Sequence, residues 1–439
     1  MGRNVAASAR GPVHASEDQG YSRRRAVITE QIPVFQGALI EGRGAIVASV
    51  ESIRDRVLEL RLGTEQQQQS ATEAFIGALS TVETLFANSD NDLGARVQVF
   101  FNSLNQLSTS PTDPSYRQGV LTASGNLAEC IQNVARKMSD QVRQIDLSVE
   151  QCVAEVNRLT AQIANINQQV ASRDKLGQDA GTLEDQRSNL ISQLASRIDI
   201  YISTSADGLT LTTANGEPLV VAGTAYTIDS APQGATAEEH VFAGNVDITS
   251  ALHGGQLGGL IQARQQIASL SAQLDSFAFA FATAVNTAHQ SGFDLNGNSG
   301  EPLFSVGATS PGCASAITLA ISDPSSLAAS SDSSTGGNGN LLNMLSLQNQ
   351  PIVVGETPSA AYSSLVFQIG GSVANAKADL QAGEIVLTHL KNLRGAISGV
   401  SLDEESANLI RFQQAYQASA RVIQTINDML DVAVNLGRN

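Results

Sequence analysis

Hydrophobic residues recur with helical spacing in several stretches of the chain, and the longest stretch runs from Met138 to Val170. Its apolar members are separated by alternating steps of four and three residues: Met138, Val142, Ile145, Val149, Cys152, Val156, Leu159, Ile163, Ile166 and Val170. This spacing places them all on one face of a helix of about nine turns. Because globular helices rarely sustain such a pattern for so long, it predicts a coiled-coil or long-bundle helix.

Shorter stretches with the same spacing predict further helices. A stripe through Val50, Val57 and Leu60 predicts a helix that begins at Val50. A second helix is expected to end at Ser110-Pro111, because proline disfavours a helical conformation of the residue before it. Helices are also expected over residues 183–194, 259–289 and 361–395.

The period changes from helical to strand-like after residue 198. Three runs rich in β-branched residues follow one another: Asp199–Thr204, Leu209–Thr213 and Leu219–Val221. Asp207-Gly208 and Asn215-Gly216 separate them, and these dipeptides are the strongest short signals for hairpin turns. We therefore predict a small antiparallel sheet within residues 198–250.

The last stretch of the chain carries two offset rows of apolar residues that repeat every seven positions. We call these residues the terminal stripe: Leu402, Leu409, Phe412, Tyr416, Ile423, Ile426 and Leu430. A heptad repeat with two rows is typical of a helix that lies along another helix. Since an isolated helix is marginally stable in water, we predict that this helix binds partners and serves as an assembly element.

These patterns predict a mainly α fold: an elongated helical bundle or coiled coil formed by the N- and C-terminal parts, with a small antiparallel β region inserted between them. The expected organisation is an N-terminal segment at 1–44, a long-helix bundle at 45–197, the β subdomain at 198–250, a bundle helix at 255–290, a reduced outer region of strands and loops at 291–360, and a bundle helix with the terminal assembly helix at 361–439. Residues 1–19 show no helical stripe, and we expect them to be disordered.

Composition narrows the class of protein. Aromatic residues make up 4% of the chain and tryptophan is absent, whereas a compact enzyme of 439 residues normally has more large aromatic side chains in its core. The formal net charge of −16 argues against a nucleic-acid-binding protein or a protein that binds anionic membranes. The sequence contains neither a run of eighteen apolar residues nor an N-terminal signal peptide, so we expect no membrane insertion.

Candidate chemistry is sparse. Asp294–Gly300 resembles the start of a calcium loop, but Ser299 and Ser305 occupy the places where an EF-hand needs glycine and glutamate, so we expect a tight turn instead. Cys130 and Cys152 are too far apart on one helix to form a disulfide. The five histidines form no metal-binding pair, and Asp403-Glu404-Glu405 fit the start of a helix better than a catalytic pair. We therefore expect no enzyme activity, catalytic residues, metal site or cofactor.

Four stretches resemble, in order, the hook-associated protein 1 (FlgK) family of bacterial flagellar hook–filament junction proteins. They are GYSRRR at Gly20–Arg25, FFNSLNQLSTSPTDPSYRQGVL at Phe100–Leu121, LEDQRSNLISQLAS at Leu183–Ser196, and GVSLDEE from Gly399 followed by ANLIRFQQAYQASARVIQTINDML. The sequence departs from this family at residues 1–19, because family members carry an amphipathic helix there that is missing from this stretch.

The resemblance implies a structural subunit that joins hook to filament and acts by self-association. Its implied partners are copies of itself in a ring, the hook protein, the second junction protein, and an export chaperone that covers the terminal stripe before assembly. It also implies export by the flagellar type III apparatus without a cleaved signal, to the extracellular flagellum. Two alternatives remain: another axial protein, such as the second junction protein or a flagellin, and an enzyme embedded in the axial structure.

Overall fold

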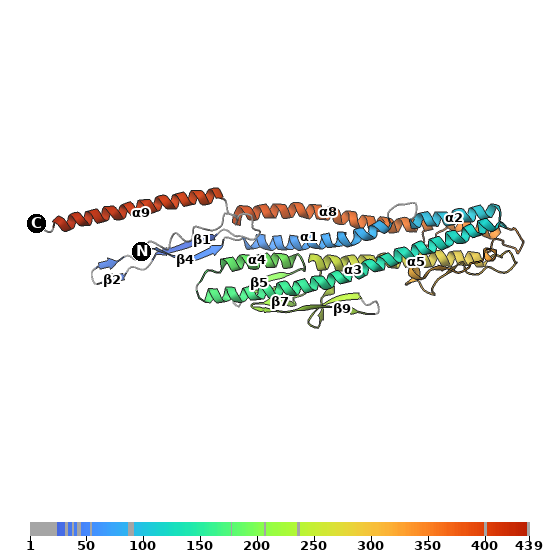
Figure 1. Cartoon of the computed structure of the whole chain (residues 1–439), viewed down its shortest axis with the longest axis horizontal. Coiled ribbons are helices and arrows are strands. Elements are labelled where there is room, and N and C mark those ends of the chain that lie inside the picture. Colours follow the sequence, from blue (N-terminus) through green and yellow to red (C-terminus); the bar gives the residue numbers. More distant parts are fainter. Residues whose placement is uncertain are drawn as a thin grey trace. The chain divides into compact units, whose positions relative to one another are not determined.

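The structure is a computed structural model, and it is mainly helical with short inserted antiparallel strands, as the sequence predicted (Figure 1). It describes residues 24–30, 34–36, 39–41, 45–52, 55–86, 92–176, 178–205, 208–234, 238–398 and 402–436. The expectation that residues 1–19 are disordered, and with it the missing first helix, lies outside these ranges. Within them, no helix is both long enough and apolar enough to cross a membrane.

The helices account for most of the described chain. They are α1 Arg56–Glu83, α2 Leu93–Thr109, α3 Pro114–Lys175, α4 Gly181–Ala195, α5 Gly255–Gln290, α6 Cys313–Ala316, α7 Gly339–Ser346, α8 Pro358–Ser398 and α9 Leu402–Leu436. Single 3-10 turns occur at η1 Thr84–Phe86, η2 Thr249–Ala251, η3 Pro324–Ser326 and η4 Leu347–Asn349.

The strands are short and pair only in antiparallel fashion among the described residues. They are β1 Arg24–Glu30, β2 Val34–Gln36, β3 Leu39–Glu41, β4 Ala45–Ser52, β5 Tyr201–Ser205, β6 Gly208–Thr212, β7 Pro218–Val221, β8 Thr224–Ala225, β9 Ile228–Gln233, β10 Glu238–Ala243, β11 Val246–Asp247, β12 Phe304–Ser305 and β13 Thr318–Leu319. Their sheets have the orders β1-β4, β2-β3, β5-β6-β7-β8, β11-β10-β9 and β12-β13.

The predicted long helix is continuous and longer than its apolar stripe, since α3 spans 62 residues. The residues of the stripe are buried except for Val142 and Ile166, which are half-buried. Cys152 is one of the buried members, and burial raises the pKa of its thiol to about 12. It therefore acts as a small apolar side chain within the seam, as its heptad position predicted.

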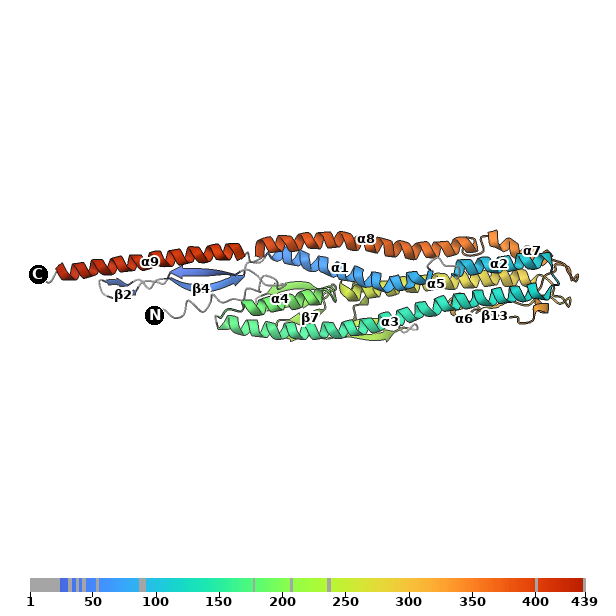
Figure 2. The ribbon, with the colours of Figure 1, turned by 45° about the horizontal axis from the view of Figure 1, so that its top comes forward.

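The chain forms two compact units, residues 64–164 with 193–386 and residues 1–63 with 165–192 and 387–439. In the first unit, the apolar face of α5 is buried from Leu257 to Val285. Phe281 of α5 packs edge-on against Phe100 and Phe101 of α2, with ring centroids 5.7 and 6.2 Å apart. Asp146 of α3 pairs with Arg264 of α5 at 3.0 Å. Helix α5 thus lies beside both α2 and α3 (Figure 2).

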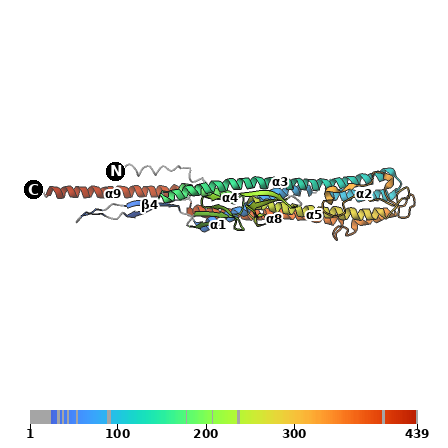
Figure 3. The ribbon, with the colours of Figure 1, turned by 90° about the horizontal axis from the view of Figure 1, so that it is seen from below.

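The β region predicted for residues 198–250 consists of the β5–β8 and β9–β11 sheets. Asn157 of α3 attaches it to the helices, because its side-chain amide accepts from the Ile228 N–H at 2.9 Å and donates to the Ile228 carbonyl at 2.7 Å. Arg264 also donates to the Glu239 carbonyl. The strands consequently lie against α3 and α5 (Figure 3).

The segment after α5, predicted as a reduced outer region, packs on the helices of the same unit. Leu303, Phe304, Ile317, Leu341 and Met344 are all buried. Phe304 lies 6.2 Å from both Phe100 and Phe281, measured between ring centroids, and the Asn286 side chain of α5 holds its backbone N–H and carbonyl. Short helices and a two-stranded ladder therefore cover part of α2 and α5.

The structure corrects the predicted start of the first helix in the other unit. Val50 belongs to β4, which pairs with β1, and α1 begins at Arg56. Alternating β-branched residues favour the strand, and the Asp55 carboxylate accepts from the N–H groups of Val57 and Leu58, which starts the helix. Residues 45–52 of the long-helix bundle predicted for 45–197 therefore form a strand instead. Ile53, which also has the helical spacing of Val50 and Val57, lies outside the described residues.

Helices α1 and α8 meet within this second unit, which contains residues 1–63 and 387–439. Leu58 and Leu62 of α1 form a buried cluster with Leu387 and Leu390 of α8. Arg394 of α8 lies 3.9 Å from Glu59, although both side chains are about one-third exposed and their pairing adds little stability. The apolar cluster therefore contributes more to this contact than the ion pair does.

The α3 seam can be tested with matched aspartate substitutions. Ile145→Asp and Leu159→Asp place a charge without a partner at buried positions, which should lower the free energy of unfolding by at least about 3 kcal/mol. Leu147→Asp is the control on the same helix, because Leu147 is 50% exposed and the change should be within about 0.5 kcal/mol. Urea unfolding followed by circular dichroism measures all three, and equal stabilities would contradict burial of the seam.

The close approach of α5 to α1 can be tested at Gly259. A Cβ atom there would lie 2.0 Å from the Ala71 carbonyl oxygen of α1, so Gly259→Ala should lower the free energy of unfolding by about 1–3 kcal/mol. Gly77 within α1 has nothing within 4 Å of an added Cβ, so Gly77→Ala should raise stability by up to about 1 kcal/mol. Thermal unfolding of the two variants should therefore shift in opposite directions, and a shift in the same direction would refute the contact.

Candidate assembly surface on the C-terminal helix

Helix α9 presents apolar side chains to solvent in the part that the structure describes. Five members of the terminal stripe are between 50% and 77% exposed: Leu409, Phe412, Tyr416, Ile423 and Ile426. Seven-residue spacing places Leu409, Tyr416 and Ile423 on one line along the helix, with Phe412 and Ile426 beside it. The side chains of Leu402 and Leu430, the remaining members, lie outside the described part of the structure.

Four apolar residues of α9 that we did not assign to the terminal stripe are also exposed: Ile410, Val422, Met429 and Val432. Val422 and Met429 are themselves seven residues apart, so the same heptad signal would have found them. The helix therefore offers apolar surface on more than one side. Such a helix gains stability when several neighbours surround it, since burial of each large apolar side chain contributes about 1.5–3 kcal/mol.

Sequence reasoning also missed exposed apolar residues on α8. Phe367 is 81% exposed and Ile385 is 72% exposed. They are eighteen residues apart, which is about five helical turns, so they lie on the same face. Ala374 and Ala378 occupy that face between them and are exposed as well. This spacing of five helical turns was the signal available in the sequence. It identifies an exposed face only when the buried face of α8 is known.

The Asp294 loop is a turn, as predicted. The Asp294 carboxylate accepts from the N–H groups of Asn296 and Asn298, both at 2.8 Å, and Gly297 adopts a positive φ of 78°. These hydrogen bonds lower the pKa of Asp294, although its slight burial opposes them. The carboxylate therefore stabilises the turn, because its hydrogen bonds come from backbone N–H groups of the same loop.

Among the residues that the structure describes, no three His, Cys, Asp or Glu side chains gather closely enough to hold a metal ion. Burial raises the pKa of the thiol of each of the three cysteines, Cys130, Cys152 and Cys313. A raised pKa keeps a thiol protonated and weakly nucleophilic. Asp403, Glu404 and Glu405 lie in the first turn of α9, but their side chains are outside the described part.

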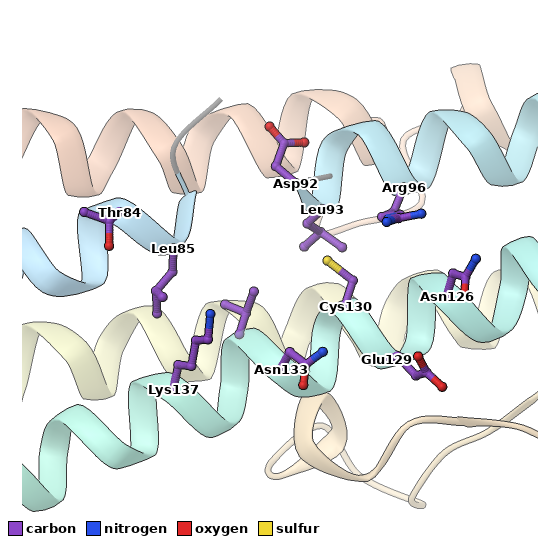
Figure 4. A pocket seen from close by; sticks show the side chains of 11 residues that line it. Thr84, Leu85, Asp92, Leu93, Arg96, Asn126, Glu129, Cys130, Asn133 and Lys137 are labelled. Atoms are coloured by element: carbon purple, nitrogen blue, oxygen red, sulfur yellow. The ribbon is translucent and has the colours of Figure 1, made fainter. Parts of the chain in front are cut away.

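A cavity of about 480 Å³ lies between η1, the start of α2, and α3 (Figure 4). Charged side chains of both signs line it, including Asp92, Arg96, Glu129 and Lys137. The Asp92 carboxylate caps α2 by accepting from the Ala95 N–H at 2.7 Å. Cys130, which also lines the cavity, has a raised pKa because it is buried. The arrangement caps a helix and does not place an activated nucleophile beside a base.

Comparisons with known proteins match both the helical part of the chain and the segment that contains α9. Residues 79–304 match the family model "Flagellar hook-associated protein FlgK helical domain". This match covers 226 of the 439 residues of the chain. Residues 395–436, which contain α9, match the model "Flagellar basal body rod FlgEFG protein C-terminal".

Curated relatives match nearly the whole chain. Flagellar hook-associated protein 1 of Escherichia coli (strain K12) is 27% identical over 514 aligned positions, which cover 95% of this chain and 94% of the relative. The protein of the same name from Bacillus subtilis (strain 168) is 25% identical, and the match covers 98% of this chain and 94% of the relative.

The fold is also that of a solved structure, the flagellar hook junction protein FlgK from Burkholderia pseudomallei. The TM-score is 0.70 at 16% identity, and the match covers 77% of this chain and all of the other. At this identity the likeness establishes the fold alone. The family model, which matches more than half of the chain, establishes more: the chain belongs to the flagellar hook-associated protein FlgK family and is a structural protein of the flagellar axis.

Proposed function

We propose that this chain joins the flagellar hook to the filament as a structural subunit that self-associates through α9. The observation that carries the proposal is the exposure of the terminal stripe, in which Leu409, Phe412, Tyr416, Ile423 and Ile426 are each at least half exposed. The match of residues 395–436 to the C-terminal segment of basal body rod proteins supports a role for this helix in axial assembly.

The energetics favour a covered α9. The helix has 35 residues, and its side chains from Leu409 to Met429 are exposed, so packing within this chain contributes little to its order. An isolated helix in water gains little from its own hydrogen bonds, whereas each stripe residue that a neighbour covers contributes about 1.5–3 kcal/mol. Assembly is then the step that stabilises α9.

The partners of this surface follow from its chemistry and from the family. Before export, a chaperone covers the terminal stripe and prevents aggregation of its apolar side chains. After export, copies of the same chain in a ring cover it, with the hook protein on one side and the second junction protein on the other. The chain leaves the cell through the flagellar type III apparatus without a cleaved signal and functions in the extracellular flagellum.

The proposed role is structural and not enzymatic. The curated relatives are named for their association with the hook, and none of those names describes a reaction. Two of the polar groups that the structure describes illustrate this: the Asp92 carboxylate caps α2, and Arg264 pairs with Asp146 between two helices. No catalytic residue or cofactor is needed for a subunit that acts by packing against its neighbours.

Substitutions on the two sides of α9 test this function. Ile423→Asp and Ile426→Asp place a charge on the terminal stripe and should abolish chaperone binding and hook–filament joining, because a charge in a packed helical seam loses its hydration. Gln414→Asp is the control on the same helix. Gln414 is exposed and lies two residues from both Phe412 and Tyr416, about 200° around the helix from each.

The measurements are motility and filament attachment in cells that express each variant as their only copy, together with chaperone binding by the purified chain. All variants should unfold at nearly the wild-type urea concentration, since the substituted side chains are exposed. Wild-type joining by both stripe variants would refute the proposal. A loss of joining that is equal for Gln414→Asp would show that charge alone, and not the stripe, is responsible.

A further inference from the structure

A buried histidine holds a segment of backbone at the carboxyl end of α5. His289 is fully buried near the last turn of α5, and its Nε2 lies 2.9 Å from the backbone N of Ala328. Its other ring nitrogen, Nδ1, bonds to the carbonyl oxygen of Glu301. Ala328 belongs to residues 324–330, which we call the strap, and the strap crosses the end of α5.

The backbone groups determine the protonation of His289. A backbone N–H can only donate, so Nε2 must accept from Ala328 through its lone pair. A carbonyl can only accept, so Nδ1 must carry the hydrogen that bonds to Glu301. Both bonds therefore require neutral imidazole with its hydrogen on Nδ1. A proton added to Nε2 would face the Ala328 N–H with a second donor and remove that bond.

The strap is held by polar side chains from three helices, and all of them bind its backbone. Arg117 of α3 donates to the carbonyls of Pro324 and Leu327 at 3.0 and 2.8 Å. Asn340 of α7 donates to the Ala328 carbonyl at 2.9 Å. Since His289 takes the N–H of the same residue, Ala328 is held through both of its peptide groups. Ser330 also exchanges two backbone hydrogen bonds with Phe293, just after α5, but the bond from His289 is the one between the strap and α5 that depends on a titratable group.

The charges around His289 oppose its protonation. Burial lowers the pKa of His289, the Glu301 carbonyl raises it, and the guanidinium of Arg117 lowers it again. Helix α5 has no ionisable side chain between Asp275 and His289, and α7 contributes the neutral Asn340. Asp294, in the turn after α5, acts on Arg117. On the strap side, the Asp323 carboxylate accepts from the Ser325 N–H and is exposed.

We propose that His289 is an acid-operated latch: protonation of its Nε2 breaks the bond to Ala328 and releases the strap from α5, while the rest of the helical bundle stays folded. The proton comes from solvent, and the freed imidazolium becomes hydrated as the strap moves away. Leu327, Ala328 and Ala329, which are buried in the closed form, become exposed in the open form. A fall in pH thereby exposes apolar side chains of the strap at this end of the bundle.

The sign of the pH dependence follows from the lowered pKa. An unfolded or open segment binds a proton at the ordinary histidine pKa of about 6.5, whereas the closed strap does not. Closure is therefore fully favourable above about pH 6.5 and is lost as the pH falls toward the pKa of the closed form. Between these two pKa values, the equilibrium constant for opening of the strap should rise by up to about tenfold for each unit by which the pH falls.

Hydrogen exchange of the full-length chain, measured at about pH 7 and pH 5 and corrected for intrinsic rates, tests the latch. The amides of residues 325–330 should lose protection by at least about tenfold at the lower pH, while those of residues 260–285 in α5 should not. His289→Gln, whose amide can accept from Ala328 and donate to Glu301 without titrating, should remove this pH dependence. His389→Gln, at an exposed histidine of α8, should leave it unchanged.

Equal protection of the strap at both pH values in the wild-type chain would overturn the proposal, and so would the same acid-induced loss in His289→Gln. A second measurement needs no variant. Nitrogen-15 chemical shifts of His289 in the wild-type chain should show hydrogen on Nδ1 at neutral pH and a titration midpoint below about 6.5. Hydrogen on Nε2, or a midpoint at or above that value, would also refute the latch.

Discussion

Burial of the apolar face of α5 is the interaction on which the larger unit depends. Three separate parts of the chain pack on this helix: α2 through Phe100 and Phe101, α3 through the Asp146–Arg264 pair, and the segment after α5 through Phe304. Phe100, Phe101 and Phe304 pack against Phe281 of this helix, and Asp146 of α3 finds its charged partner in Arg264. An aromatic content of 4% is sufficient, since five of the thirteen phenylalanines meet at this one place.

Buried and half-buried polar side chains then determine which backbone segments attach to the helices. Arg264 joins α5 to Asp146 and to the Glu239 carbonyl, and Asn157 holds the backbone of Ile228 from α3. A buried charge or amide is costly without partners, so each of these groups stabilises only the arrangement that satisfies it. The β region and the strap are thereby fixed in register against helices that would otherwise offer only apolar contact.

The apolar residues of α9 differ from those of the bundle because they are exposed to solvent. Leu409, Phe412 and Tyr416 have the same character as the buried residues of α3 but remain exposed within this chain. Exposed apolar side chains of this kind gain free energy when a neighbour covers them, as the proposed assembly through α9 requires. This contrast between a filled bundle and an uncovered terminal helix is what connects the fold to an axial, structural role.

Sequence periodicity determined the elements whose signal is long. The alternating spacing from Met138 to Val170 specifies one helix face over nine turns, and α3 has that form because no other structure places those residues together. The hairpin β6–β7 follows likewise from the Asn215-Gly216 turn, since Gly216 adopts the positive φ that the turn needs. The terminal stripe was also readable from spacing alone, although its binding role is a proposal.

Tertiary structure decided the rest, because the deciding partner is distant in the sequence. Val50 fits a helical stripe locally, yet pairing with Ala26 makes it part of a strand. Arg117 finds its acceptors at Pro324 and Leu327, about two hundred residues further along, and no local pattern reveals them. The exposure of Phe367 depends likewise on which face of α8 the bundle covers. Periodicity reports which residues share a face; only packing determines what that face meets.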